Sequence, residues 1–487
     1  MKIRLLLVLV LSGVTVVFGQ KKDWAAHYAT LIDSVDLRTH LEVLASDAYE
    51  GRETGKKGQQ MAAAYLIEKF KKIGVAQAPG STGYEQYFKV VETKPGGSIT
   101  WSNKTLAFKS DFIYYGAKSK WSVNDLPLMT LETAKLLKPI TYVLVAKIET
   151  FELRAEVQRL KVAAPSGLKG IVLLHPNYDQ VYEYLEHYTT TPSMRLLDNE
   201  QREEIPTIMV NTKSIEASLS KPFRYLIGKG KQSKKASKKA IGVLSGTLNE
   251  GETILTSSNV LAFIPGSDPI LSKEIIVITA HYDHIGIDNG TVYNGADDDG
   301  TGTVALLELA EAFMQAYREG HGVRRSILIM PVSGEEKGLL GSSYYTDHPV
   351  IPLEQTVANL NIDMIGRNDI AHENKKNYIY VIGADRLSDD LHNANEWANT
   401  NYTKLELDYR FNDPKDPNQF YYRSDHYNFA KNNIPSVFYF SGVHEDYHQP
   451  TDDIEKIIFS KVELVTRLVF HTAWKLANET ERPRLKL

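Results

Sequence analysis

The second half of the chain alternates between short apolar runs and longer amphipathic segments. Runs that are typical of buried strands occur at 275–279, 326–332, 357–362, 378–382 and 436–440. Apolar positions at helical spacing predict helices at 302–317, 386–400 and 454–478. Because strands that alternate with helices form sheets covered by helices, this pattern predicts an α/β fold. We expect a mixed, mostly parallel central sheet that is flanked by helices on both faces.

The first half follows a different pattern. Helices are predicted at 37–46 and 59–73, and Gly74 is a natural stop for the second. Between residues 99 and 245 the runs become shorter and alternate with charged helical pieces. We therefore predict an inserted, smaller, β-rich α/β domain. The expected division is 1–19 as a signal peptide, 20–98 as the N-terminal part of the main domain, 99–245 as the insert, and 246–487 as the rest of the main domain.

The N-terminus has the pattern of an export signal. Lys2 and Arg4 precede an apolar stretch that runs with interruptions to Phe18, and small or aliphatic residues precede a plausible cleavage after Gly19. The stretch is short for a membrane span, and a retained N-terminal anchor is the alternative interpretation. We expect a periplasmic or extracellular protein without stable membrane insertion.

Composition limits the chemistry. The 487 residues include no cysteine, which excludes disulfides and thiolates as metal ligands or nucleophiles. Any metal would therefore be held by histidine and carboxylate side chains. The formal net charge of −4 gives no reason to expect binding to nucleic acid or to an anionic membrane surface. Nothing in the sequence predicts the oligomeric state.

Histidines and carboxylates gather where the predicted strands end, or in loops close to them. The candidates, in chain order, are His281, Asp298, Glu335, Glu336, Asp363 and His448. Ligands in open α/β sheets bind outside the carboxyl ends of strands, so these distant groups could meet at one edge of one sheet. Two histidines and three carboxylates suit zinc. Three ligands for each ion, with one ligand shared, would leave room for a water between two ions.

Each motif has a plainer interpretation when it is taken alone. The acidic run 297–299 between glycines could be a solvated turn, and a Ca²⁺ loop is a second alternative although its twelve-residue oxygen pattern is missing. Glu335 and Glu336 could be an exposed pair, and Asp363 could pair with an arginine. Tyr447 could hydrogen-bond an oxyanion or belong to a polar surface loop. The shared placement of the motifs favours the metal interpretation.

The order and spacing of the motifs also match a known family. The motifs are His281-x-Asp283, Gly295-Ala296-Asp297-Asp298, Gly334-Glu335-Glu336-x-Gly338-Leu339-x-Gly341-Ser342, Asn361-Ile362-Asp363-Met364 and Tyr447-His448. Over about 260–453 they resemble the metallopeptidase family M28 of di-zinc aminopeptidases. The stretch Glu50-Gly51-Arg52 resembles the family's N-terminal element, and the insert resembles, more weakly, a protease-associated (PA) domain. The resemblance implies the zinc-dependent exopeptidase fold.

The resemblance implies a role for each group. Asp298 would bridge two zinc ions per chain, with His281 and Asp363 completing one site and Glu336 and His448 the other. Glu335 would be the general base, and Asp283 would orient His281. A non-proline cis peptide bond is implied between residues 298 and 299. Arg423 and Asp425 would help to build the substrate pocket, and a purely structural role for the buried Asp-His step at 425–426 is the alternative.

These expectations combine into an exported di-zinc metallopeptidase, an aminopeptidase that acts on peptide or protein N-termini. The water between the zinc ions would attack the scissile carbonyl, Glu335 would pass its proton to the leaving amine, and Tyr447 could stabilise the oxyanion. A carboxypeptidase is an alternative, with Arg423 or Arg367 receiving the substrate carboxylate. A glutaminyl cyclase on the same fold would need one zinc. A non-enzymatic binding protein is disfavoured by the intact ligand set.

Overall fold

The catalytic candidates belong to a mixed eight-stranded sheet with the strand order β1-β13-β17-β14-β18-β21-β19-β20. The computed structural model describes residues 22–117, 120–150, 152–198, 205–231, 238–249, 251–375 and 377–486. Four neighbouring strands are parallel, and they are β17 (Ser326–Val332), β14 (Ile275–His281), β18 (Thr356–Ile362) and β21 (Ser436–Phe440). On either side, β13 (Ala262–Ile264) and β19 (Tyr378–Ile382) run antiparallel to their neighbours in this group. The outermost strands are β1 (Ala76–Gln77) and β20 (Glu406–Asp408). The predicted fold class is confirmed, and five predicted strands lie within a few residues of their expected positions.

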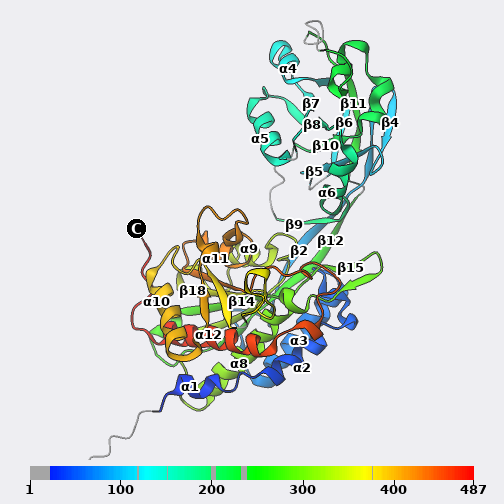
Figure 1. The fold of residues 1–487 in the computed structure, drawn as a ribbon. Helices are drawn as coiled ribbons and strands as arrows, with labels where there is room; N and C mark the ends of the chain where they lie inside the picture. Colours follow the sequence, from blue (N-terminus) through cyan, green and yellow to red (C-terminus); the bar gives the residue numbers. More distant parts are fainter. Residues whose placement is uncertain are drawn as a thin grey trace, which may run out of the picture.

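Helices cover both faces of this sheet because its central strands are apolar on both sides (Figure 1). On one face, Ile276 and Ile278 of β14 pack against α2 (Ser34–Leu44), α3 (Lys57–Ile73), α8 (Gly302–Arg318) and α12 (Phe459–Asn478). On the other face, Val277 belongs to a cluster with Tyr345 of α9 (Leu340–Asp347) and Phe429 of α11 (His426–Ala430). Neighbouring residues of β14 therefore belong alternately to two apolar clusters, one on each face of the sheet, and this alternation fixes the register of the strand.

Two predicted helices differ at their starts. The segment expected as one helix at 454–478 is a short 3-10 turn (Ile454–Lys456) followed by α12 from Phe459. The segment 386–400 forms α10 (Asp389–Ala398), which begins where the hydroxyl of Ser388 accepts a hydrogen bond from the Leu391 N–H. The capping residue Ser388 sets the start of α10, and the spacing of apolar residues does not reveal such a cap.

A second eight-stranded sheet has the order β4-β3-β11-β6-β7-β8-β10-β5 and is formed between residues 97 and 248. Four of its strands are β3 (Gly97–Trp101), β4 (Lys104–Ala107), β5 (Phe112–Tyr115) and β11 (Gly242–Leu248). Its parallel strands are β6 (Trp121–Met129), β7 (Tyr142–Lys147), β8 (Leu168–Leu174) and β10 (Thr207–Val210). Helices α5 (Leu153–Ala163) and α6 (Tyr178–Thr190) accompany this sheet. It has apolar clusters of its own on its two faces, so it does not depend on the first sheet for a core. The domain limits expected from the sequence stay a prediction.

A long hairpin-like ladder links the two sheets, and apolar patterning did not predict it. Strands β2 (Glu85–Lys94) and β12 (Gly251–Val260) pair antiparallel along their whole length, and β9 (Ser193–Leu196) joins β2. Figure 1 shows the second sheet standing away from the first at the end of this ladder. Phe88, Val90 and Leu196 of the ladder pack against Leu340 at the start of α9. The ladder is thus in contact with the segment that follows Glu335 and Glu336.

The expected signal peptide, 1–19, lies outside the described residues. A search of the described helices found none with the length and apolar character needed to span a membrane.

Candidate metal centre

The six candidate residues reach one edge of the first sheet from separate elements. His281 is the last residue of β14, Glu335 and Glu336 follow β17, and Asp363 directly follows β18. Asp298 lies in the turn Ala296–Thr301 that leads into α8, and His448 lies in the loop after β21. Parallel strands place their carboxyl ends at the same edge, and this is why residues far apart in sequence meet here.

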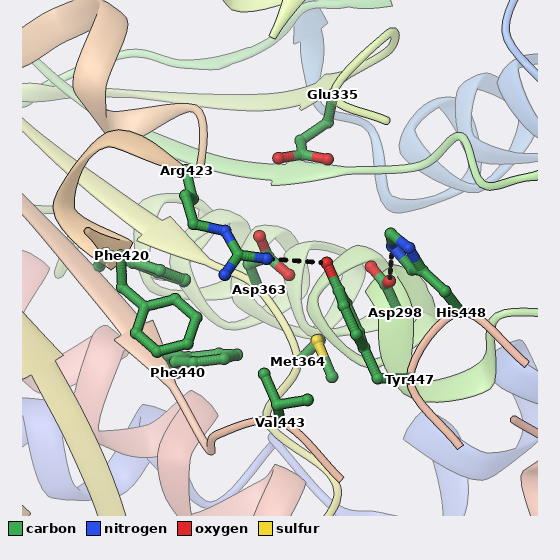
Figure 2. A pocket seen from close by; sticks show the side chains of 11 residues that line it. Asp298, Glu335, Asp363, Met364, Phe420, Arg423, Phe440, Val443, Tyr447 and His448 are labelled. Atoms are coloured by element: carbon green, nitrogen blue, oxygen red, sulfur yellow. Dashed lines mark hydrogen bonds and ion pairs between the residues drawn. The ribbon is translucent and has the colours of Figure 1, made fainter. Parts of the chain in front are cut away.

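Asp298 lies between the two histidines. Its Oδ1 is 3.2 Å from Nε2 of His281, and its Oδ2 is 3.2 Å from Nε2 of His448 (Figure 2). Asp363 Oδ1 lies 3.5 Å from the same nitrogen of His281, and Glu336 Oε2 lies 3.1 Å from that of His448. The five residues therefore form two sets of three that share one carboxylate.

The proton arrangement of His281 favours a cation in the first set. Its Nδ1 lies 3.0 Å from the main-chain oxygen of Asp283, so Nδ1 donates and the neutral ring turns the lone pair of Nε2 toward two carboxylates. Nε2 of His281 and Oδ2 of Asp298 are buried and have no hydrogen-bond partner in the described structure. A lone pair that faces carboxylate oxygens is stable when a cation lies between them.

The spacing of the four contacts also fits zinc. Zinc bonds of about 2.0–2.2 Å to nitrogen and oxygen, in tetrahedral geometry, place neighbouring ligand atoms about 3.3–3.6 Å apart. The four histidine–carboxylate distances are 3.1, 3.2, 3.2 and 3.5 Å. The residues present therefore fit two zinc sites joined by Asp298.

The electrostatics show what the cluster does without a cation. Burial lowers the pKa of His281, but the charges of Asp363 and Glu335 outweigh burial and raise this pKa well above its ordinary value. Burial raises the pKa of Asp298, and the imidazoles of His281 and His448 outweigh it and hold the pKa well below its usual range. Protons on the histidines thus take the place that a divalent cation would fill.

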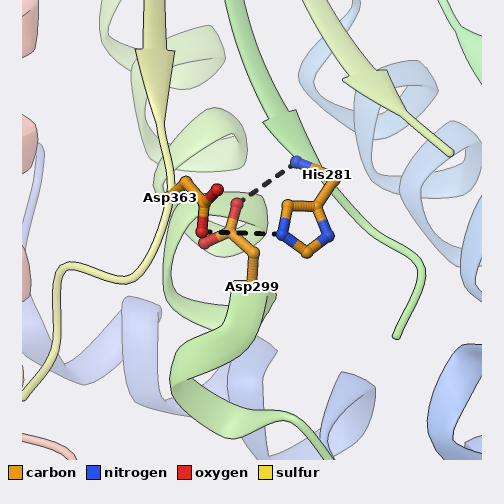
Figure 3. Close-up of side chains that lie close together, drawn as sticks. All are labelled: His281, Asp299 and Asp363. Carbon is orange, nitrogen blue, oxygen red and sulfur yellow. Dashed lines mark hydrogen bonds and ion pairs between the residues drawn. The ribbon is translucent and has the colours of Figure 1, made fainter. Parts of the chain in front are cut away.

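Asp299 also lies beside His281, and together with Asp363 the two form a group that could hold a metal (Figure 3). The carboxylate of Asp299 is already engaged. Its Oδ1 accepts hydrogen bonds from the main-chain N–H of Gly302 at 2.9 Å and of Met364 at 3.1 Å, and its Oδ2 accepts from that of His281 at 3.2 Å. These bonds fasten the loop to two strand ends, which favours Asp298 over Asp299 as the shared ligand.

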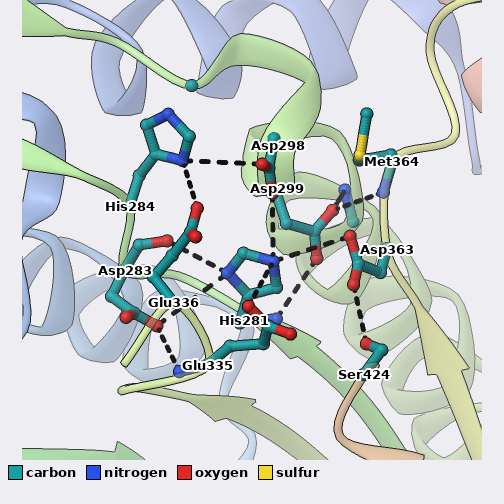
Figure 4. A network of polar contacts seen from close by, with 12 residues as sticks. His281, Asp283, His284, Asp298, Asp299, Glu335, Glu336, Asp363, Met364 and Ser424 are labelled. Carbon is teal, nitrogen blue, oxygen red and sulfur yellow. Dashed lines mark hydrogen bonds and ion pairs between the residues drawn. The ribbon is translucent and has the colours of Figure 1, made fainter. Parts of the chain in front are cut away.

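His284 is a third histidine at the centre, and the sequence analysis did not single it out. It is fully buried, and with Asp298 and Glu336 it forms the second group that could hold a metal (Figure 4). Its Nδ1 lies 2.7 Å from Oε1 of Glu336 and 3.9 Å from Oδ2 of Asp298. The first distance is that of a close ion-pair contact and is too short for two ligands of one zinc ion. His284 therefore fits best as the group that orients Glu336. Its position three residues after His281 is the signal that could have found it.

The acid Asp283 is present at the centre, although its side chain has a different partner from the one expected. Its Oδ1 lies 3.8 Å from Nδ1 of His281, so the closer acceptor for that ring is the main-chain oxygen. The carboxylate instead accepts from the hydroxyl of Thr54 at 2.6 Å and from the main-chain N–H of Glu335 at 3.3 Å. Asp283 thereby connects the ends of β14 and β17.

Other buried groups hold the loops of the centre in place. The peptide bond between Asp298 and Asp299 is cis, as the resemblance implied. Asp452 accepts from the main-chain N–H of Asp298 at 3.1 Å, and Ser424 donates to Oδ2 of Asp363 at 2.6 Å. The buried guanidinium of Arg52 donates to four main-chain oxygens, those of Leu44, Tyr282, Asn294 and Gly295. Sequence spacing could not assign these partners because they come from distant segments.

A pocket opens beside the two sets (Figure 2). Asp298, Glu335, Asp363 and His448 form its polar side, and Tyr447 and Arg423 lie at its mouth. Glu335 is the glutamate that faces this pocket, whereas Glu336 is turned toward the two histidines. Asp425 is not among the lining side chains, because it is buried and accepts a hydrogen bond from the hydroxyl of Ser342.

Comparison with known proteins agrees with this geometry. Residues 259–473 match the sequence model of "Peptidase family M28". Aminopeptidase YwaD of Bacillus subtilis (strain 168) is 27% identical over 238 residues, which are 47% of this chain and 47% of that protein. The chain spans about half the length of the first curated relatives it matches.

Two solved structures share the fold. An aminopeptidase from Aneurinibacillus sp. strain AM-1 has a TM-score of 0.59 at 16% identity, with 95% of this chain and 98% of that chain covered. BSAP, a zinc aminopeptidase from Bacillus subtilis, has a TM-score of 0.52 at 16% identity, with 92% and 96% covered. At this identity the likeness concerns the fold. The family match covers the first sheet from β14 to β21, together with all six candidate residues, and we conclude that residues 259–473 form a domain of peptidase family M28.

Proposed function

We propose that this protein is a zinc-dependent exopeptidase of the aminopeptidase type, which removes the first residue of peptides or proteins. The observation that carries the proposal is the position of Asp298, with one carboxylate oxygen 3.2 Å from each of two histidines. A shared carboxylate of this kind suits two ions with a reaction site between them. The relative and the two solved structures reported above are each named as aminopeptidases, and these names support the choice of reaction.

In this proposal, His281, Asp298 and Asp363 hold one zinc ion, and Asp298, Glu336 and His448 hold the other. When bound, the pair of ions would activate a water molecule as the nucleophile and polarise the scissile carbonyl. The main-chain oxygen of Asp283 keeps the proton of His281 on Nδ1, so Nε2 is free to ligate. His284 plays the corresponding part for Glu336, because it engages Oε1 and leaves Oε2 directed at His448.

Glu335 acts as the general base. Its carboxylate lines the pocket and its Oε2 lies 4.0 Å from Nε2 of His281, so it stands beside the space in which the attacking water would lie. Asp283 fixes the main chain of Glu335. Glu335 takes the proton of the water and gives it to the leaving amine. The phenol of Tyr447 accepts a hydrogen bond from Arg423 at 3.2 Å, so its own O–H can donate to the carbonyl oxygen as negative charge develops.

We further propose that residues 1–19 direct export to the periplasm or beyond, and that the second sheet is a PA-like domain carried by the enzyme. The support is the apolar N-terminal pattern and the separate apolar clusters of the second sheet.

Hydrolysis of amino-acid 4-nitroanilides tests the function. We expect activity that a chelator abolishes and zinc restores, with two zinc ions per chain by metal analysis. Glu335→Gln should lower kcat by roughly a thousandfold, about 4 kcal/mol in activation free energy, and should keep both ions. Glu354→Gln, an exposed glutamate outside the pocket, is the matched control and should change neither.

Three results would contradict the proposal. An active Glu335→Gln variant would remove the assigned base. Inert anilides together with release of C-terminal residues would identify a carboxypeptidase, and cyclisation of N-terminal glutamine with one zinc per chain would identify a glutaminyl cyclase.

A further inference from the structure

Arg423 is a cation at the mouth of the pocket, and it has no acidic partner in the described part of the chain. Two contacts hold it there. Its guanidinium carbon lies 4.8 Å from the centre of the Phe420 ring, and its Nη2 donates to the hydroxyl of Tyr447 at 3.2 Å. Figure 2 shows the guanidinium directed across the pocket toward this phenol. Its remaining N–H groups form no hydrogen bond with the described residues and are available to a ligand.

Neighbouring arginines are engaged differently. Arg367 pairs with Asp446 at 2.9 Å, and Arg410 pairs with Asp408 at 2.7 Å. Both therefore have their charge balanced within the protein. Arg423 is held in one orientation by an aromatic ring and a phenol, which fix its position and leave its charge unbalanced.

The remaining wall of the pocket is apolar. Its side chains are Met364, Phe420, Phe438, Phe440 and Val443. A group that fills this space would need an apolar stem. It would also need a polar end, because a purely apolar group would remove water from the guanidinium of Arg423 without replacing the lost hydrogen bonds. A carboxylate on a short methylene stem satisfies both requirements, because a guanidinium binds a carboxylate with two parallel hydrogen bonds.

Building on the proposed function, we infer that Arg423 receives a carboxylate of the substrate and makes the enzyme selective for peptides with an acidic group next to the cleaved bond. Two positions on a peptide can supply this group. One is the side chain of an N-terminal glutamate or aspartate, and the other is the free C-terminus of a dipeptide. The carboxylates of Asp298 and Asp363 in the same pocket are directed at the histidines, so they leave the guanidinium of Arg423 to the carboxylate of the substrate.

Paired substrates that differ in one charge test the inference on the full chain with zinc. Glutamyl and glutaminyl 4-nitroanilides examine the side chain, and Ala-Ala and Ala-Ala-amide examine the C-terminus. In one of the two pairs we expect the acidic member to have a kcat/KM about tenfold or more above its neutral partner, the effect of one charge-assisted pair. Arg423→Gln should remove this preference, so that kcat/KM falls about tenfold more for the acidic member of the pair than for its neutral partner, which loses only the contact of Arg423 with Tyr447. Arg423→Lys should keep part of the preference.

Arg386→Gln is the matched control, because Arg386 stacks on Tyr421 at 4.4 Å and lies outside the pocket. It should leave the preference intact. Circular dichroism and the melting temperature should be unchanged in Arg423→Gln. A wild-type enzyme with no preference in either pair, or an Arg423→Gln variant that slows all four substrates equally, would overturn the inference. Wild-type protein that cleaves none of the four would instead contradict the proposed function.

Discussion

The chain carries two eight-stranded sheets with parallel strands at their centres, and their strand ends differ. After β14, β17 and β18 of the first sheet stand acids and histidines, and the buried Asp283 and Asp363 have partners of their own in Thr54 and Ser424. In the second sheet, His175 follows β8 and Asn211 follows β10. A ring nitrogen of His175 and the side-chain oxygen of Asn211 each accept a hydrogen bond from the main-chain N–H two residues further along the chain. Among the described residues, both groups that could hold a metal belong to the first sheet.

This difference distinguishes the contribution of the fold, which is the meeting of strand ends, from that of the local sequence, which is the choice of side chains at those ends. A parallel sheet brings strand ends together in both places. Crowding several acids at such an edge is unfavourable unless opposite charge balances them, and the histidines and hydrogen-bond donors of the first sheet supply part of that balance. In our account the zinc ions supply the rest.

Removing the shared ligand should give the largest effect. Asp298→Asn takes a ligand from both proposed zinc sites at once, so we expect loss of both ions and at least a thousandfold loss of activity, about 4 kcal/mol or more in activation free energy. Asp299→Asn is the adjacent control. Its amide oxygen can still accept from Gly302 and Met364, so both ions should remain bound. Metal analysis after dialysis decides between them. Loss of metal from Asp299→Asn alone would reverse the assignment.

Matched core truncations compare the two sheets directly. Leu173 of β8 and Leu328 of β17 are both fully buried, and each change to Ala should lower the free energy of unfolding by about 2–5 kcal/mol. Leu328→Ala should also weaken zinc binding, because β17 leads directly to Glu335 and Glu336. Leu173→Ala should leave it unchanged. Calorimetry and zinc titration measure the two quantities, and equal effects on zinc would show that the sheets are coupled more tightly than we propose.

Two buried histidines sharpen the comparison further. His284→Ala removes the group beside Oε1 of Glu336 and should weaken binding of the second zinc ion about 10–100-fold, with the first less affected. His175→Ala is the counterpart at the end of β8, and it should not change zinc affinity. Competition titration with a chromogenic chelator resolves the two ions. Zinc affinities that are the same in wild type and His284→Ala would exclude the positioning role.

The smallest effect is expected at Glu308 in α8, the helix that follows the acidic turn. Burial raises the pKa of Glu308 to about 8, and Asp36 and Glu311 add to this. In the unfolded chain this group ionises near pH 4.5, whereas the folded chain keeps it protonated until about pH 8, so its presence costs stability increasingly as pH rises through that window. Glu308→Gln should stabilise the protein by about 1–3 kcal/mol at pH 8 and very little at pH 4. A pH-independent change in unfolding free energy would contradict this assignment.

The sequence predicted the parts of the structure that depend on local pattern. Apolar runs identified β17, β19 and β21 at their observed limits, because strands buried on both faces have no polar interruptions. Spacing and resemblance together predicted five ligands, and the structure brings these five side chains together, while their binding of zinc stays a prediction. His284 was missed because its partner Glu336 lies 52 residues away, and the ladder of β2 and β12 was missed because its pairing joins residues more than 150 apart. The partner of Asp283 was missed because a main-chain oxygen leaves no trace in a motif.

Anomalous diffraction at the zinc absorption edge, from crystals grown with zinc, tests the central claim most directly. The account predicts two peaks, one among His281, Asp298 and Asp363 and one among Asp298, Glu336 and His448, with Asp298 between them. A single peak, or a peak ligated by Asp299 or His284 in place of Asp298 or His448, would contradict it.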